Sequence, residues 1–112
     1  MIVRVSVDQG GAGTTILHGG IAGYYCYLIG AMLTMDIAGT AQFTTLSNAA
    51  NSQALTGVFN LGITGGFVLP TSKVPYLRSA LEGGSITLIT ATGQANGVVV
   101  LAFSPEEDYV LA

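Results

Sequence analysis

The residues that could carry out chemistry are few in this sequence, and they are scattered. The single cysteine, Cys26, and the single histidine, His18, are separated by the turn-like sequence GGIAG. A nucleophilic cysteine needs a base within hydrogen-bond reach, and a metal site needs several converging ligands. The spacing indicates neither arrangement. We therefore expect Cys26, inside the apolar run YYCYLI, to be a small buried residue.

The acidic residues do not suggest a catalytic pair either. Asp8, Asp36 and Glu82 each lie close before glycines, at predicted turns. Carboxylates at turns usually accept hydrogen bonds from nearby backbone groups. Three consecutive acids begin at Glu106, and they cannot share one face of a strand. This run is typical of a solvated acidic tail rather than of a calcium site.

Sequence motifs for nucleophilic or phosphate chemistry are also missing. A serine hydrolase places its nucleophile in a GxSxG turn, which this sequence lacks. The patterns GGAG and GGIAG are not followed by the GK[ST] of a phosphate-binding loop. We therefore expect no enzyme activity, no cofactor and no metal site.

The composition raises the question of what covers the surface. The chain has 112 residues, which suits one domain spanning 1–112. Only 8% of its residues are charged, 50% are hydrophobic, and the mean hydropathy is +0.62. Because a typical soluble domain is about 25% charged, this chain cannot coat its own surface with charges. Either a membrane or other protein chains must cover the apolar surface.

Neither a membrane nor a nucleic acid suits this chain as a partner. The longest apolar run, 19–35, carries no charge, but it contains four glycines and three tyrosines, and no Lys or Arg flanks it. The N-terminal sequence MIVRVSVDQGG has no continuous apolar stretch, so it does not predict a signal peptide. The chain has only three basic residues and a net charge of −3. This is too little positive charge to bind a phosphate backbone.

Hydrophobic periodicity is mostly two, which predicts strands rather than helices. Alternation along 2–7, for example, places Val3, Val5 and Val7 on one apolar face. Eight short strands are expected between glycine-rich turns, which favours an all-β sandwich or barrel. They fall at 2–7, 14–18, 24–35 (which also divides into 24–31 and 32–35), 40–46, 55–61, 67–70, 85–91 and 98–103.

The connections follow from the same pattern. Residues 24–35 and 40–46 are expected to form a hairpin whose turn is 36–39. Residues 47–54 are expected to form a loop, and Gly57 a bulge in the strand that follows. The segment 71–84 is expected to be a long crossing loop with one helical turn, and 104–112 an acidic tail.

Four tyrosines leave a binding function open. Tyr24, Tyr25, Tyr27 and Tyr76 could stack on sugar rings, as aromatic side chains do at interfaces. Alternation places Tyr25 and Tyr27 on the same face of a strand, where packing against other side chains is the simpler interpretation.

From residue 23 to residue 103 the sequence resembles small jelly-roll structural proteins of tailed bacteriophages. These are decoration (cement) proteins and related head or fibre modules. The resemblance rests on LTG, GGFVLP, PYL, ALEGG, SITLI and GVVVLAF, at 55–57, 65–70, 75–77, 80–84, 85–89 and 97–103. The chain departs from the family at YLRS, where an aromatic pair is usual, and at Glu82, which precedes Gly83 instead of following a glycine.

The resemblance implies a jelly-roll β-sandwich of about eight short antiparallel strands. It further implies a homotrimer, made in the host cytoplasm, that binds the major capsid protein on the outer surface of the capsid and stabilises the shell. Three copies would then form a closed ring of heterologous contacts. The alternative is a carbohydrate-binding head-fibre or tail module that recognises glycans on the host surface.

Contacts with the capsid or between subunits are expected at the few charged and aromatic positions of the loop and of the flanking segments. Lys73 and Arg78 should reach toward acidic groups of a neighbour, with Glu82 as a further partner. Segments 1–13 and 104–112 lie outside the matched pieces and are expected to be contact arms. The candidate contact residues are Lys73, Tyr76, Arg78, Glu82, Arg4 and Tyr109.

Overall fold

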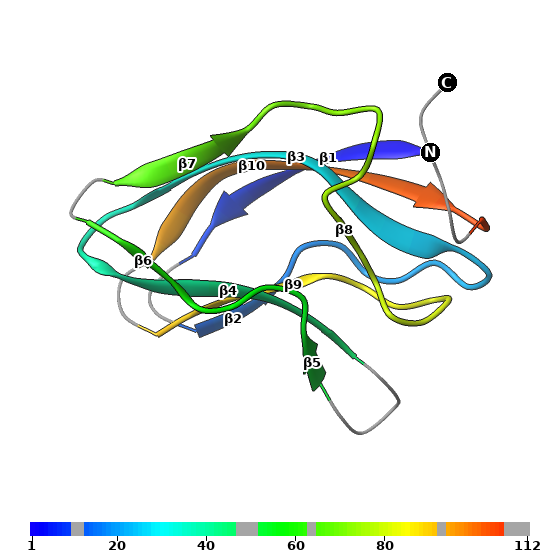
Figure 1. Cartoon of the computed structure of the whole chain (residues 1–112), viewed down its shortest axis with the longest axis horizontal. Helices are drawn as coiled ribbons and strands as arrows, with labels where there is room; N and C mark the ends of the chain where they lie inside the picture. Colours follow the sequence, from blue (N-terminus) through cyan, green and yellow to red (C-terminus); the bar gives the residue numbers. More distant parts are fainter. Residues whose placement is uncertain (10–12, 47–51, 63–64, 92–93, 107–112) are drawn as a thin grey trace.

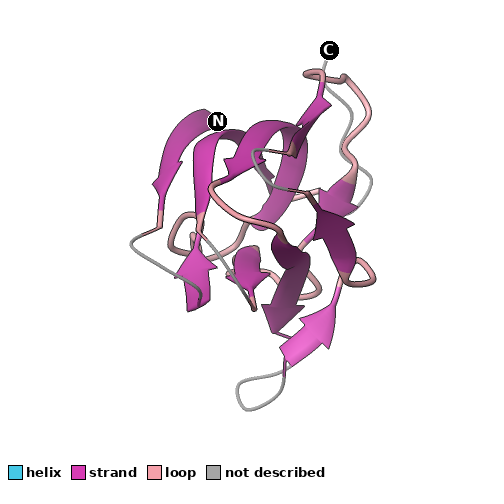
Figure 2. Ribbon diagram, turned by 90° about the vertical axis from the view of Figure 1, so that its left-hand side faces the viewer, coloured by secondary structure: helices cyan, strands magenta, loops and turns pink. Residues whose placement is uncertain are grey.

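Two antiparallel sheets are packed face to face in the computed structural model, which describes residues 1–9, 13–46, 52–62, 65–91 and 94–106. Figure 1 shows the sheets as an upper and a lower layer. The described residues contain strands and connections but no helix (Figure 2). The predicted all-β sandwich is therefore confirmed.

Each sheet contains five strands. The first, sheet A, has the order β1 (Ile2–Asp8), β10 (Ala95–Ser104), β3 (Tyr25–Met35), β7 (Gly66–Leu69), and β8 (Leu77–Arg78) also pairs with β3. The second, sheet B, has the order β2 (Gly13–Ile16), β9 (Thr87–Thr90), β4 (Gly39–Leu46), β5 (Ser52–Ala54), and β6 (Phe59–Leu61) also pairs with β4.

The winding of the chain identifies the sandwich as a jelly roll. β5 and β6 share one position beside β4, and β7 and β8 share one position beside β3. The ten strands therefore fill eight positions, four in each sheet. The chain alternates between the sheets from β1 to β4, stays in sheet B for β5 and β6, and returns through β7 to sheet A. This order is the double Greek key of a jelly roll.

The predicted hairpin between residues 24–35 and 40–46 is wrong. β3 lies in sheet A and β4 in sheet B, and the two strands do not pair. Both strands have apolar inward faces, so they pack against each other across the core instead of side by side. The turn between them is fixed by Asp36, whose Oδ1 accepts hydrogen bonds from the backbone N–H groups of Ile37 (2.8 Å) and Gln94 (2.7 Å).

β3 is one continuous strand with an irregularity in its middle. Val100 pairs with Gly30 and Leu101 with Leu28, so Ile29 has no partner on β10. The extra residue at this bulge switches the core-facing positions of the strand from even to odd numbers. Cys26 and Leu28 face the core before it, and Ala31, Leu33 and Met35 face the core after it.

Three other connections differ from expectation. Residues 52–54 form β5 where a loop was predicted, and the predicted strand 55–61 keeps only its last three residues, as β6. The predicted irregularity near Gly57 occurs just before it, where the N–H groups of Leu55 and Thr56 both donate to the Phe43 carbonyl. The segment 71–84 contains no helical turn; it includes β8 and follows the edge of β3.

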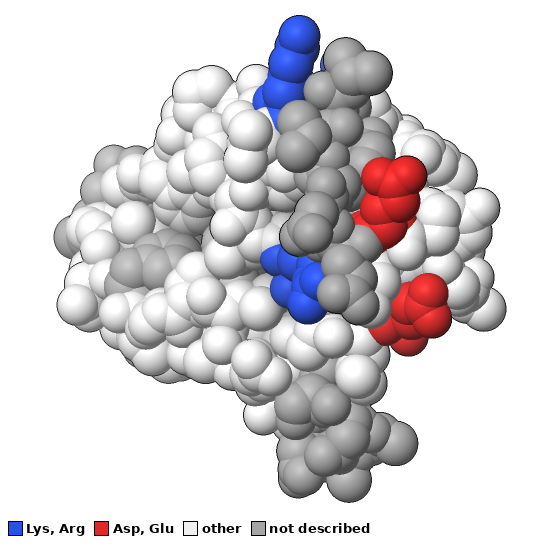
Figure 3. All heavy atoms as spheres, turned by 45° about the vertical axis from the view of Figure 1, so that its right-hand side comes forward, with Lys and Arg blue, Asp and Glu red and all other residues white. Residues whose placement is uncertain are grey.

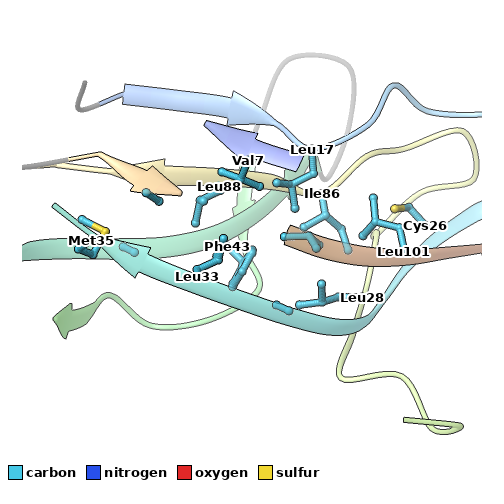
Figure 4. Close-up of a cluster of buried hydrophobic side chains, with 14 of the residues drawn as sticks. Val7, Leu17, Cys26, Leu28, Leu33, Met35, Phe43, Ile86, Leu88 and Leu101 are labelled. Atoms are coloured by element: carbon cyan, nitrogen blue, oxygen red, sulfur yellow. The ribbon is translucent and has the colours of Figure 1, made fainter. Parts of the chain in front are cut away.

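The core lies between the sheets and contains residues from both of them (Figure 4). Leu28 and Leu101 come from sheet A, and Phe43 and Leu88 come from sheet B; all four are buried. Cys26 is fully buried, as predicted, and its burial raises the pKa of the thiol to about 12. The thiol therefore stays protonated at neutral pH, which suits a packing residue.

A buried polar cluster joins both sheets at one end of the sandwich. Gln9 is almost fully buried, and its Nε2 donates to Thr15 Oγ1 at 2.9 Å. Its Oε1 accepts hydrogen bonds from Thr90 Oγ1 at 3.1 Å and from the Ala95 N–H at 2.9 Å. One amide side chain therefore ties β2, β9 and β10 together.

Replacing Gln9 with leucine should lower the free energy of unfolding. The substitution leaves the buried Ala95 N–H without the acceptor that Gln9 provides, which costs about 1–3 kcal/mol. Urea denaturation measures the loss, and Gln53→Leu, at an exposed position on β5, is the matched control. Equal losses in both variants would contradict a structural role for the buried amide.

Candidate interface on the outer face of sheet A

The outer face of sheet A carries apolar side chains in the positions where a solvent-exposed sheet usually carries polar ones. Val98 on β10 pairs with Met32 on β3, which in turn pairs with Val68 on β7. Together with Val100 they form what we call the apolar patch. Met32 is 52% exposed and Val68 is 64% exposed, whereas Val98 and Val100 are half-buried.

A shallow depression of about 210 Å³ is part of this patch. Its wall includes Pro70 and Thr71, which follow β7. Gly30 makes this packing possible, since a Cβ atom at Gly30 would lie 3.0 Å from Thr71 Oγ1 and 3.2 Å from Thr71 Cα. The missing side chain thus lets the segment after β7 approach β3 closely.

Among the described residues, the charged side chains of this face lie at its borders. Among the outward-facing residues of β10, β3 and β7 there is none; the borders carry Arg4 and Asp8 on β1 and Arg78 on β8. Figure 3, which views the sandwich from the side and not onto this face, shows a few separate charged side chains among uncharged surface. The patch therefore offers a partner an apolar contact with no charge to desolvate.

The other half of the same face is covered by the chain itself. Tyr27, Ile29 and Ala102 form a second buried cluster, against which Tyr25 and Val100 pack. Tyr27 Oη donates a hydrogen bond to the Glu106 carbonyl, so the residues after β10 return over this cluster. The predicted placement of Tyr25 and Tyr27 on one face is confirmed. Tyr27 is buried in this cluster and is not exposed for binding.

The segment 70–84 contains the predicted crossing loop 71–84, which connects β7 in sheet A to β9 in sheet B, but it first follows the edge of sheet A as an irregular strand that includes β8. Its backbone N–H groups donate to carbonyls of β3 and of the residue before it. The pairs are Ser72 to Ile29 (2.9 Å), Tyr76 to Leu28, Ser79 to Cys26, and Gly83 to Tyr24 (2.8 Å each). Between the first two pairs, residues 73–75 bend outward, and we call them the excursion. A 2.7 Å hydrogen bond from Tyr76 Oη to the Pro70 carbonyl closes it.

The basic residues of this segment have different surroundings. Lys73 is exposed on the excursion. Arg78 is half-buried, and its guanidinium carbon lies 4.7 Å from the centre of the Tyr25 ring, in cation–π geometry. Glu82 is exposed at a turn, and within the described part of the chain neither Lys73 nor Glu82 forms an ion pair. The structure therefore does not bring the predicted charged residues together.

The remaining predicted contact residues lie in the flanking segments. Arg4 is exposed on the outer face of β1, opposite Val100. Most of segment 1–13 is the edge strand β1, so a contact there would involve the strand and not an extended arm. Of the tail 104–112 only 104–106 are described, and Tyr109 lies outside the described residues.

Met32 and Val68 are not among the contact residues predicted from the sequence. A signal was present, because 24–35, 67–70 and 98–103 are apolar at consecutive positions and not only at alternate ones. In an antiparallel sheet such a run means that both faces are covered. One face packs on the core, and the other presents apolar side chains outward.

The geometry thus defines a jelly-roll sandwich with an uncharged apolar patch on the outer face of sheet A. No family model and no curated protein matches the sequence. Among solved structures, one described as that of the infectious bursal disease virus Gx strain is 14% identical, with a TM-score of 0.44. The match covers 97% of this chain and 32% of that one, so this chain spans about a third of its length.

No group of three or more His, Cys, Asp and Glu side chains that could hold a metal ion occurs in the described part of the chain. None of its described segments is a helix long and apolar enough to cross a membrane.

Proposed function

We propose that this chain is a non-enzymatic structural protein of a virion. In this proposal it is a decoration (cement) protein that is made in the host cytoplasm, assembles as a homotrimer and binds the major capsid protein on the outer capsid surface. The observation that carries the proposal is the apolar patch on sheet A, with Met32 and Val68 more than half exposed. The jelly-roll winding and the sequence resemblance to phage decoration proteins support it.

The apolar patch supports the association of copies with one another. The cores of homo-oligomeric interfaces are depleted of charge and rich in apolar side chains, as this patch is. A stable interface buries about 800 Å² on each partner, so four side chains form the centre of such a contact rather than all of it. In a closed ring of three copies, the patch of one copy packs against a different surface of the next.

The edge segment 70–84 supports the contact with the shell. Lys73 stands exposed on the excursion, and within the described part of the chain no acidic group pairs with it. An unpaired ammonium at a surface attracts acidic groups of a partner and speeds association. Arg78 is assigned to the packing of Tyr25 and not to the capsid contact.

Replacing Lys73 with alanine should weaken binding to capsid shells by about threefold to tenfold at low salt. It should leave the thermal unfolding temperature unchanged, because the side chain is exposed. Lys73→Arg, which keeps the charge, is the matched control and should bind like the parent chain. Co-sedimentation with shells at two salt concentrations measures the effect. Normal binding of Lys73→Ala at low salt would contradict this role.

The experiment that tests the proposed function is binding to empty shells assembled from the major capsid protein of the same virus. Saturable binding to assembled shells is expected, together with shells that withstand higher temperature. Absence of binding to shells, combined with binding on a glycan array, would replace the proposal by the carbohydrate-binding alternative. The tyrosines give that alternative limited support, because Tyr27 is buried and Arg78 stacks on Tyr25.

A further inference from the structure

An apolar pocket of about 380 Å³ opens between the two sheets, on the side of the sandwich where β7 and β8 lie opposite β6. It is separate from the apolar patch, which lies on the outside of sheet A. Both sheets contribute apolar side chains to its wall: Leu28, Phe67, Leu69 and Leu77 from sheet A, and Phe43 and Leu61 from sheet B.

The pocket exists because both edge positions of the jelly roll are interrupted. In sheet B, residues 55–58 leave the ladder between β5 and β6. In sheet A, residues 70–76 leave it between β7 and β8. At both interruptions an irregular segment replaces the edge strand. It stays hydrogen-bonded to its neighbour at Leu55 and Thr56 in sheet B and at Ser72 and Tyr76 in sheet A, but it leaves part of the core beneath accessible.

Hydrogen bonds hold the rim of the pocket in place. Thr56 is tied to β4 three times: its N–H donates to the Phe43 carbonyl (3.3 Å), its Oγ1 accepts from the Phe43 N–H (3.1 Å), and its carbonyl accepts from Gln42 Nε2 (3.0 Å). On the opposite side, Tyr76 is tied to Leu28 and Pro70. A rim fixed in this way does not close readily over the apolar wall, so the pocket is preformed.

The chemistry of the wall defines the kind of ligand. Among the described residues, no charged side chain lines the pocket. The polar lining residues in this part of the chain are Thr56 and Tyr76, which already bond within the chain, and Asn60, which is exposed and whose amide can both donate and accept. We propose that this pocket binds a small neutral molecule with an aromatic or alicyclic body and one hydrogen-bonding group, which would meet Asn60.

The volume favours a small molecule over a single side chain of another protein. Ligand sites are typically about 300–1,000 Å³, and a cavity of about 150 Å³ already holds benzene. At about 380 Å³ the pocket is more than twice that size, so one inserted leucine or phenylalanine would leave much of the wall uncovered. A two-ring molecule fits this space better.

The test uses 1-naphthol, measured by isothermal titration calorimetry on the full chain. We expect a Kd of about 100 μM or below, which is a modest efficiency for an eleven-atom ligand at roughly 0.5 kcal/mol per atom. The charged analogue 1-naphthoate should bind at least about tenfold more weakly, because the wall offers its carboxylate no counter-charge. Failure of 1-naphthol to bind at millimolar concentration, or equal binding of the two probes, would overturn the proposal.

A variant at a pocket residue can be matched with one at an exposed residue outside both the pocket and the apolar patch. Leu69 lines the pocket, whereas Ile16 is 62% exposed on β2, at the edge of sheet B. Leu69→Trp should fill the pocket and weaken 1-naphthol binding by about tenfold or more, and Ile16→Trp should leave it within about twofold. If Leu69→Trp binds 1-naphthol like the parent chain, the proposal is wrong.

A second variant keeps the test decisive if Leu69→Trp does not fold. Asn60 is exposed, so Asn60→Leu should not disturb the core. It should weaken the binding of 1-naphthol several-fold while leaving that of naphthalene unchanged, because only the alcohol uses the amide. Equal effects on the two probes would overturn the assignment of Asn60.

Discussion

Replacing Gly97 with alanine is expected to lower the free energy of unfolding by about 3 kcal/mol or more, enough to unfold much of a marginally stable domain. Gly97 has a φ of 147°, which residues with a side chain rarely adopt. A Cβ atom there would lie 1.9 Å from the carbonyl oxygen of Met32 on the neighbouring strand. Since the obstructing atom belongs to the backbone of β3, it cannot move aside without breaking the β3–β10 ladder.

The matched control for this prediction is Gly19→Ala. A Cβ atom at Gly19 has no neighbour within 4 Å, and its φ is not in the left-handed region. We expect this variant to stay within about 0.5 kcal/mol of the parent chain. Chemical denaturation of the two variants side by side measures the difference. If Gly97→Ala were as stable as Gly19→Ala, the close approach of β10 to β3 would be contradicted.

Replacing Met32 with aspartate should abolish self-association while leaving the fold intact. Met32 is half-exposed at the centre of the apolar patch, so the single chain can keep the new carboxylate in water. In the assembly the same carboxylate would be buried without a counter-charge, which costs several kcal/mol. A loss of about 3 kcal/mol corresponds to a more than 100-fold weaker association. Sedimentation velocity over a concentration series measures it.

Ile16→Asp is the control that shows whether dissociation is specific to the apolar patch or follows from a charge at any exposed apolar position. Ile16 is 62% exposed, somewhat more than Met32, but it lies on β2 at the edge of sheet B. We expect the Ile16 variant to associate like the parent chain. Equal dissociation of both variants would mean that sheet A has no special role. Normal association of Met32→Asp would remove the apolar patch from the interface.

Local pattern was sufficient to predict most of the strands and the fold class. The alternation of Val3, Val5 and Val7 correctly gave the inner face of β1, and Pro70 correctly marked the end of β7. The same pattern could not show that β3 and β4 lie in different sheets instead of forming a hairpin. Whether two consecutive strands pair or face each other across a core depends on the rest of the chain, and in a jelly roll they face each other.

The interface was harder to predict than the fold. The rarity of charge made Lys73 and Arg78 conspicuous in the sequence, yet Arg78 packs on Tyr25 of its own chain. Met32 and Tyr27 both point outward from β3, and the sequence does not indicate that one is 52% exposed while the other is 3% exposed. That difference arises from residues distant in the chain, near Glu106, which cover only one half of the face.

The most direct test of the central claim, that other copies of the chain cover the apolar patch, is the native mass of the purified protein in plain buffer. Size-exclusion chromatography with light scattering provides this mass. We predict three times the chain mass of 11.4 kDa, maintained on dilution to micromolar concentration. The mass of a single chain at every concentration tested would contradict the claim that copies of this protein assemble through sheet A.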